Sequence, residues 1–380
     1  MAEGDIGSVV DTLVFFGGTH TFSDIIHVSG DIFAIVFSGT DGDGFIVTVE
    51  IDSAGNIGAS VIDTFEFDTS NCQFPDIIHI ADDIFSIAYT GAGNHGFCVT
   101  LSISDAGDIG AAVIDSLDFD TGGSLDPNII NVSGSTYAVV YVGAGNHGKV
   151  STFTISDAGD IGAAVIDSFE FDTVGCGNPR IIHVSGEVFA VFHAGSSYPG
   201  QISTFTINAG GDIGAATIDK AAYDTSSANF NRVLHVSGNV FAVVYRGPAY
   251  DGWLATVTIS DAGDIGASAI ENWEFDYWEG RHPDIMHISG DVYCIAHDSG
   301  GSAKNLITFH ISDAGDINTS LIDDFDFPAP GASYCDIIYI SGSIYGVVFR
   351  GNANVGTLKT LDVETILAAA ARHELLMGIG

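Results

Sequence analysis

The chain has 380 residues and is 46% apolar, enough to bury a large core, and its net charge is −39, from 49 acidic and 10 basic residues. This charge argues against nucleic acids and anionic membranes as partners, because both recruit clustered Lys and Arg. No apolar run reaches the roughly 18 residues that a membrane span needs. Two explanations of the acidity stay open, solubility by self-repulsion and adaptation to high salt.

The cysteine content predicts neither a disulfide framework nor a zinc site. The five cysteines are odd in number and form no Cys-x-x-Cys pair, so we expect free thiols. The start, Met1–Gly4, has no basic or apolar leader, so no secretion signal is visible. The compartment stays open, with an extracellular or surface-associated location favoured.

The first predicted element is a strand at Ile6–Phe16, which resembles the last part of a unit that then recurs along the chain. The segment Ile25–Gly30 (Ile-Ile-His-Val-Ser-Gly) returns in related form every 52 residues, starting at 25, 77, 129, 181, 233, 285 and 337. A Gly-Asp-Ile-Gly signature recurs at the same period. Internal repetition at this period indicates a repeat architecture.

Each unit reads as four strands, a to d, of which the copy around residue 181 is typical. Strand a is predicted at Ile181–Val184, strand b at Val188–His193 and strand c at Ser203–Ile207. Strand b is almost wholly apolar, as expected for a sheet sandwiched between two others. Strand d, as at Ala164–Asp172, alternates and suits an outer strand. Gly159 supplies the left-handed backbone of the c–d hairpin.

The last unit ends after its strand c, at Thr357–Val363, with no strand d behind it. The N-terminal strand can therefore complete this unit and close the ring. We predict an all-β fold, a seven-bladed β-propeller of four-stranded antiparallel blades over residues 1–363. Residues 364–380 form a tail, in which Glu364–Met377 reads as a short helix that packs on the ring or mediates oligomer formation.

The unit resembles those of seven-bladed β-propellers with highly similar blades. The hairpin at Asp105-Ala-Gly107 also resembles the Asp-box turn of sialidase-type propellers, although Ile109 and Gly110 stand where that box has its aromatic residue. In that family the turn is structural, so the resemblance implies no catalytic residue here.

Comparison of the copies separates two faces. The a–b and c–d turns are nearly constant, whereas the b–c and d–a loops differ in almost every unit, which is typical of binding loops on a rigid scaffold. Most of the scarce cations and several aromatic residues fall in or beside these loops. The predicted ligand-binding residues are Arg180, Arg232, Arg246, Arg281, Arg350, His95, His147, Tyr198, Tyr250, Trp253, Trp278 and His282.

Each candidate has a structural alternative. The arginines could neutralise the aspartates that share the start of strand a, where the copies carry Asp24, Asp76, Asn128, Arg180, Arg232, Asp284 and Asp336. The histidines of strand a, such as His27, could hold a metal, but we interpret them as one hydrogen bond per blade. The strand d aspartates, such as Asp63, receive the same interpretation. Carboxylates of the c–d turns could bind calcium, although plain turn chemistry explains them.

The leading hypothesis is a non-enzymatic, lectin-like binding module that recognises a glycan or a protein through the variable face, using Arg forks and aromatic stacking. The first alternative is a glycoside hydrolase or lyase of sialidase-like propeller type, which could use Arg180, Arg232, Arg246, Asp284 and Tyr250. No catalytic motif supports it, so we expect no catalytic residue and no obligate cofactor. The second alternative is a structural or assembly ring that uses the tail.

Overall fold

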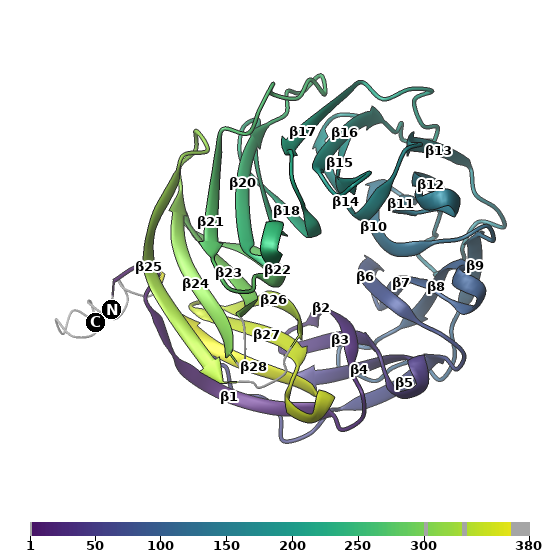
Figure 1. Cartoon of the computed structure of the whole chain (residues 1–380). Helices are drawn as coiled ribbons and strands as arrows, with labels where there is room; N and C mark the ends of the chain where they lie inside the picture. The colour runs from purple at the N-terminus through teal and green to yellow at the C-terminus, as the bar shows by residue number, and fades with distance from the viewer. Residues whose placement is uncertain (1, 300–302, 329–332, 366–380) are drawn as a thin grey trace, which may run out of the picture.

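The computed structural model describes residues 2–299, 303–328 and 333–365. These residues form seven four-stranded antiparallel sheets, arranged as blades around a central axis (Figure 1). Strand a of each blade lies nearest the axis and strand d lies outermost. The predicted seven-bladed β-propeller is confirmed.

The innermost strands, a, are β2 (Thr21–Ser29), β6 (Gln73–Ala81), β10 (Leu125–Ser133), β14 (Cys176–Ser185), β18 (Asn229–Ser237), β22 (Arg281–Ser289) and β26 (Ser333–Ser341). The strands b are β3 (Ile32–Ser38), β7 (Ile84–Thr90), β11 (Thr136–Val142), β15 (Val188–Gly195), β19 (Val240–Arg246), β23 (Val292–Ser299) and β27 (Ile344–Arg350).

The strands c are β4 (Gly44–Glu50), β8 (Gly96–Ser102), β12 (Gly148–Thr154), β16 (Gly200–Thr206), β20 (Gly252–Thr258), β24 (Ala303–Ile311) and β28 (Gly356–Val363). The outermost strands, d, are β5 (Asp63–Asp68), β9 (Asp115–Asp120), β13 (Asp167–Asp172), β17 (Asp219–Asp224), β21 (Glu271–Asp276), β25 (Ile317–Pro328) and β1 (Ile6–Phe16).

Two predicted boundaries were wrong for physical reasons. Strand a begins about five residues earlier than predicted, at Cys176 in β14, because a bulge between Gly177 and Arg180 keeps the added residues paired with strand b. Strand d begins later, at Asp167 in β13, because Asp167, opposite Thr152, is the first residue that pairs in the ladder with β12.

The ring closes as predicted. β1 pairs antiparallel with β28, from Ile6 opposite Val363 to Phe16 opposite Gly356 (Figure 1).

The predicted C-terminal helix is not shown: Glu364 and Thr365 are not helical, and the rest of that segment lies outside the described residues. No helix within the described ranges is long and apolar enough to cross a membrane.

Neighbouring blades are joined by two hydrogen bonds that recur around the whole ring. In one, the carboxylate at the start of strand d accepts the backbone N–H of an isoleucine after the next blade's c–d turn, as Asp63 does from Ile109 at 2.9 Å. In the other, a strand c threonine donates to the carbonyl oxygen of a turn glycine in the next blade, as Thr48 does to Gly107 at 2.6 Å. The interpretation of the strand d aspartates as structural is confirmed.

The hydrophobic core is divided into seven clusters, each packed between two adjacent blades. All seven residues of β3 and of β11 are buried, because strand b has a neighbouring blade on both sides. The a–b and c–d turns lie on one face of the ring, which we call the turn face. The b–c and d–a loops lie on the other, the loop face.

Candidate ligand-binding site

Seven side chains surround the axis at the loop face, one from each blade, and we call them the collar. Each follows the first residue or residues of strand a, at a bulge in its pairing with strand b. The collar consists of Phe22, Phe74, Asp126, Asn178, Phe230, His282 and Tyr334. All seven have φ between 45° and 60°, in the left-handed region. This conformation costs an ordinary L-residue about 1–2 kcal/mol, so the collar holds its aromatic side chains under strain.

Five of the collar residues form an aromatic arc. Phe22 lies between Phe74 and Tyr334, with ring centroids 4.0 and 4.6 Å away, and His282 lies 4.3 Å from both Tyr334 and Phe230. The remaining two residues close the circle with polar groups. Asn178 donates to Asp126 at 2.6 Å and accepts the backbone N–H of Phe230 at 3.0 Å.

A second ring lies two residues further along strand a, and we call it the floor. It consists of Asp24, Asp76, Asn128, Arg180, Arg232, Asp284 and Asp336. Five of these side chains accept a backbone N–H from the next blade, as Asp24 does from Ile77 and Asn128 does from Ile181. One oxygen of each is therefore committed to joining the blades, a role that differs from the charge pairing with arginine considered from the sequence.

Arg180 and Arg232 break this pattern, because a guanidinium group cannot accept a hydrogen bond. Arg180 donates to Asp126 at 3.0 Å and is nearly buried. The Arg232 side chain keeps 32% of its surface exposed, and its Nε lies 3.9 Å from Asp284 Oδ1, at the limit of an ion pair. Arg232 therefore presents donor groups to the space between the two rings.

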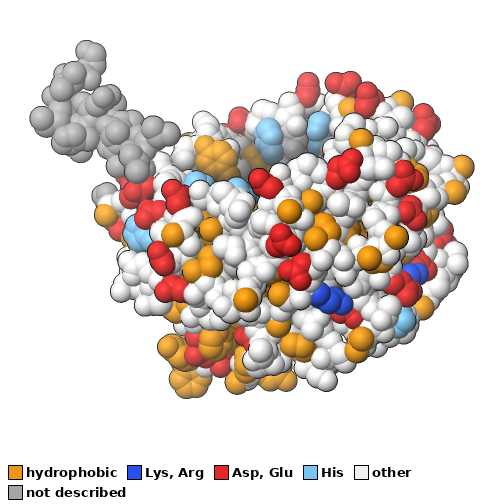
Figure 2. All heavy atoms as spheres, turned by 90° about the horizontal axis from the view of Figure 1, so that it is seen from above, with side chains coloured by type: hydrophobic (Ala, Val, Ile, Leu, Met, Phe, Trp, Pro, Cys, Tyr) orange, Lys and Arg blue, Asp and Glu red, His pale blue; other side chains and the backbone are white. Residues whose placement is uncertain are grey.

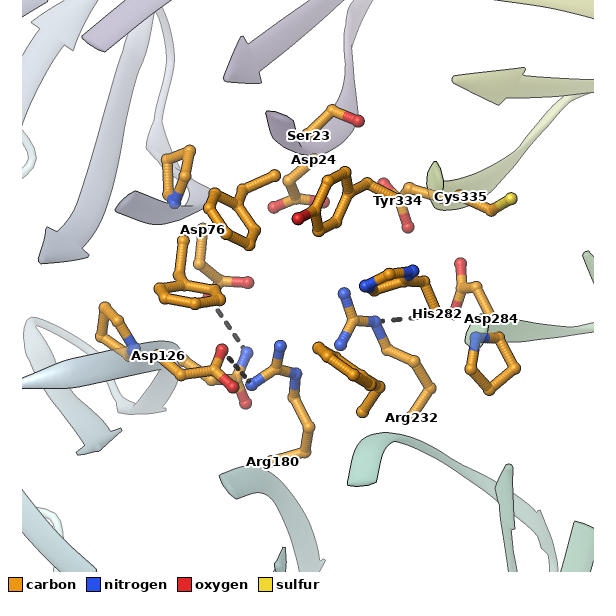
Figure 3. Close-up of a pocket in the computed structure, with 18 of the residues that line it drawn as sticks. Ser23, Asp24, Asp76, Asp126, Arg180, Arg232, His282, Asp284, Tyr334 and Cys335 are labelled. Atoms are coloured by element: carbon orange, nitrogen blue, oxygen red, sulfur yellow. Dashed lines mark hydrogen bonds and ion pairs between the residues drawn. The ribbon is translucent and has the colours of Figure 1, made fainter. Parts of the chain in front are cut away.

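That space is a cavity of about 280 Å³. Figure 3 shows Arg180 and Arg232 reaching into it from one side, with Asp24 and Asp76 facing them. Burial raises the pKa of Asp76 to about 7, and the charge of Asp24 adds to the effect. Burial also raises the pKa of Asp336 well above its usual value. The raised pKa values favour the neutral form of these two carboxyl groups, which can donate as well as accept a hydrogen bond.

Two further arginines support the collar from outside. The guanidinium carbon of Arg246 lies 4.7 Å from the centre of the Phe230 ring, and that of Arg350 lies 5.2 Å from the centre of the Tyr334 ring. Both residues end a strand b, so their side chains reach across the blade to the collar. Cation–π contacts of this kind hold aromatic rings in place.

The predicted binding residues fall into three groups. Arg180, Arg232 and His282 line the cavity. We number the blades from blade 1, β2–β5, to blade 7, β26–β28 with β1. A second group lies on the loop face of blades 4 to 7: Arg246, Arg281, Arg350, Tyr198, Tyr250 and Trp278. The third group lies elsewhere: His95 and His147 pair with Asp118 and Glu170 of the outer strands, and Trp253 packs on a core cluster.

The sequence reasoning missed six of the seven collar residues: Phe22, Phe74, Asp126, Asn178, Phe230 and Tyr334. These positions lie beside well-repeated residues, and an aromatic residue in a strand is usually assigned to the core. A signal was present nonetheless. When the seven copies are superimposed, this one position alternates between aromatic and polar residues immediately before the repeated start of strand a.

The strand a histidines lie toward the turn face and act within their own blades. His27 Nε2 lies 2.9 Å from the carbonyl oxygen of Gly30, and four other histidines repeat this contact across their a–b turns. Asn131 donates to Gly134, and Tyr339 accepts from the Gly342 N–H. The structural interpretation is confirmed. Within the described ranges, no group of three or more His, Cys, Asp or Glu is placed to hold a metal ion.

Comparison with known proteins identifies the architecture alone. No protein-family model matches the chain, and no curated protein matches it. A protein from Bacteroides fragilis, described as a candidate 6-phosphogluconolactonase, superimposes with a TM-score of 0.60 at 13% identity, over 92% of this chain and 96% of that one. Sqt1 from Chaetomium thermophilum gives a TM-score of 0.58 at 10% identity, over 96% and 100%. At these identities the likeness shows the propeller fold and nothing about ligand or activity.

Proposed function

We propose that this protein is a glycan-binding propeller that takes a terminal sugar residue into the cavity between the collar and the floor. The observation that carries the proposal is the collar itself. Phe22, Phe74, Phe230 and Tyr334 occupy backbone positions that glycine or asparagine would fill without strain. Strain of this kind persists where the side chain has a role that the backbone cannot supply.

The chemistry of the two rings suits a sugar. Aromatic faces pack against the C–H surface of a sugar ring, and a mixture of carboxyl, amide and guanidinium groups satisfies its hydroxyls, which both donate and accept. The floor supplies Asp24, Asp76, Asn128 and Arg232 for this purpose. A cavity of about 280 Å³ lies below the range of drug-sized pockets, so the part of the ligand inside it is small.

The test is a glycan array probed with the full chain, followed by titration of the best monosaccharide. Arg232→Gln removes the guanidinium that faces the cavity, and Phe230→Asn places in the collar the residue that blade 4 already carries as Asn178. Each variant should weaken binding at least about tenfold, the loss expected for a buried charged hydrogen bond or a stacked ring.

Tyr339→Asn is the matched control on the turn face, because Asn131 fills that position in blade 3 and also bonds across its own a–b turn, where it donates to the carbonyl oxygen of Gly134. It should bind like the parent. An array without any bound glycan, or glycan binding that survives both Arg232→Gln and Phe230→Asn, would refute the proposal. Capture of a peptide in place of a glycan would favour the protein-binding alternative.

One observation favours a second candidate, a glycoside hydrolase. A carboxyl group with a pKa near 7, such as Asp76, is suited to general-acid catalysis at neutral pH. A tyrosine nucleophile is disfavoured, because burial raises the pKa of Tyr334, the tyrosine that lines the cavity. Asp76→Asn reproduces the residue that blade 3 carries as Asn128. Turnover of aryl glycosides that disappears in Asp76→Asn would establish the hydrolase.

A further inference from the structure

Four exposed aromatic side chains stand on the b–c and d–a loops of the loop face, and we call them the rim patch: Tyr198, Tyr250, Tyr277 and Trp278. We propose that the rim patch is a second subsite, which takes the sugar residue next to the one in the cavity, and that this second residue carries a carboxylate or sulfate group. The inference rests on the proposed function of the cavity and adds to it that the ligand is an acidic oligosaccharide.

The rim patch is the most exposed aromatic group among the described residues. Trp278 is 84% exposed, Tyr277 72%, Tyr198 61% and Tyr250 55%. In the edge-on view of Figure 2, the largest group of hydrophobic side chains lies along the lower edge of the ring. Aromatic side chains with this much free surface are typical of recognition sites on a chain that is otherwise strongly polar outside.

Backbone conformation shows that two of these rings are placed at a cost. The third residue of each described b–c turn has positive φ, and blades 2, 3 and 7 fill the position with Asn94, Asn146 and Asn354, which tolerate it. Blades 4 and 5 use Tyr198 and Tyr250 instead, with φ of 75° and 76°. Tyrosine gains nothing from a left-handed backbone, so the side chain itself explains the choice.

Two of the three loops that carry the rim patch are fixed against each other, the b–c loop with Tyr250 and the d–a loop with Trp278. The N–H of Gly280, which follows Trp278 in the d–a loop, donates to the carbonyl oxygen of Tyr250 at 2.9 Å. The loops approach so closely that a Cβ atom on Gly280 would lie 2.1 Å from the Gly252 Cα atom. Tyr250 and Trp278 are therefore presented by one locked pair of loops, which lowers the entropy lost on binding.

Arg246 connects this surface to the cavity. Its guanidinium carbon lies 4.7 Å from the ring centre of Phe230, in the collar, and 5.1 Å from that of Tyr250, in the rim patch. Arg281 approaches the same Tyr250 ring at 5.2 Å. A ligand that leaves the cavity beside Phe230 would thus meet Tyr250 next.

The charges at this junction favour an anion. Arg281 is paired with Glu279, whereas no ion pair joins Arg246 to a carboxylate among the described residues. Burial and the repulsive charge of Arg281 lower the pKa of Arg246, and the Glu279 carboxylate offsets this repulsion only in part. A carboxylate or sulfate would relieve this repulsion, and the planar guanidinium fork is suited to either group.

The experiment compares affinities on an array that carries neutral, uronic-acid-containing and sulfated glycans, from monosaccharides to tetrasaccharides. We expect acidic oligosaccharides to bind at least about tenfold more tightly than their terminal monosaccharide, with an advantage that falls as salt is raised. Neutral oligosaccharides of equal length should gain less. The affinity ratio of oligosaccharide to monosaccharide is the readout, because the cavity alone sets the monosaccharide affinity.

Two variants borrow residues that other blades carry at the same positions. Tyr250→Asn copies Asn146, and Arg246→Thr copies Thr90. Each should reduce the ratio severalfold, and Arg246→Thr should also abolish the preference for acidic chains. If monosaccharides bind but the ratio stays near one, or if neither variant lowers it, the second subsite is refuted while the cavity remains. If no glycan binds, the proposed function and this inference fail together.

Discussion

Both faces of the ring contain turns that require a left-handed backbone with positive φ. The turn face uses glycine at these positions, whereas the loop face mostly uses residues with side chains. On the turn face, the left-handed position of every a–b and c–d turn is a glycine, with Asp82 as the one exception. On the loop face, the collar and the b–c turns also need positive φ, yet they carry Phe, Tyr, His, Asn, Asp, Ser or Ala at most of these positions. On the turn face, glycine allows the chain to turn without strain. On the loop face, larger residues accept the strain, which indicates that their side chains have a role of their own.

The largest effect that we expect concerns the electrostatics of the loop face. The folded pKa of Asp76, about 7, lies above the ordinary aspartate value of 3.8, so folding favours its protonated form. Its contribution to stability is complete below about pH 4 and is lost as pH rises through 7. Asp76→Asn removes this dependence and should stabilise the protein at pH 8 by about 2–4 kcal/mol.

Urea unfolding of the parent and of Asp76→Asn at pH 4, 6 and 8 measures the difference. The two proteins should have nearly equal stability at pH 4, which serves as the internal control. A difference that does not grow with pH would show that Asp76 is ionised in the folded protein, and that the floor is less strongly desolvated than its geometry indicates.

The next effect concerns the turn face, where glycine should be needed for conformation. Gly159 has φ of 88°, and a Cβ atom there would lie 3.1 Å from Ile114 Cδ1, so Gly159→Ala should cost about 2 kcal/mol. Gly30 has φ of 53° and nothing within 4 Å of its Cβ direction, so Gly30→Ala should cost only about 1 kcal/mol. Chemical denaturation resolves the two. Equal costs would show that strain alone, without crowding, governs these turns.

The smallest effect on stability, with the largest on binding, is expected in the collar. Phe22→Gly relieves left-handed strain and loses the ring contacts to Phe74 and Tyr334. These terms are similar in size, so the free energy of unfolding should change by less than about 1 kcal/mol. Affinity for the best monosaccharide should fall at least about tenfold. If Phe22→Gly unfolds more easily but binds the monosaccharide normally, the collar serves to pack the blades and does not bind the ligand.

Much of the fold could be predicted from the sequence because seven copies report on each position. The closing strand was predicted at its observed bounds, Ile6–Phe16, since the last unit visibly lacked strand d. The face that carries the cavity followed from its variable loops. The variation at the collar position was visible in the sequence, but the cavity itself could not be predicted, because the collar depends on a bulge and on the sign of φ, which a Phe or Tyr at that position does not reveal.

The cationic residues predicted to bind a ligand lie in two different places in the structure. Clustering of scarce cations led to Arg180 and Arg232, which line the cavity, but equally to His95 and His147, which pair with outer-strand carboxylates. A loop residue can point inward to the axis or outward along the blade, and only the three-dimensional register decides this. The four floor aspartates accept backbone N–H groups from the next blade, a role that was not considered from the sequence, so one ring of side chains both joins the blades and lines the cavity.

The pairing of β1 with β28 has a consequence for how the ring assembles. Every other strand d meets its strand c across a short hairpin, whereas β1 must find β28 from the far end of the chain, a slow event because of its large sequence separation. The seven strands c present similar edges. We therefore expect β1 to find β28 after the six other edges have been occupied by their own hairpins, so that the order of folding events helps to select the final pair. A chain arrested before β28 would carry an unpaired β1, a template for association with a second copy.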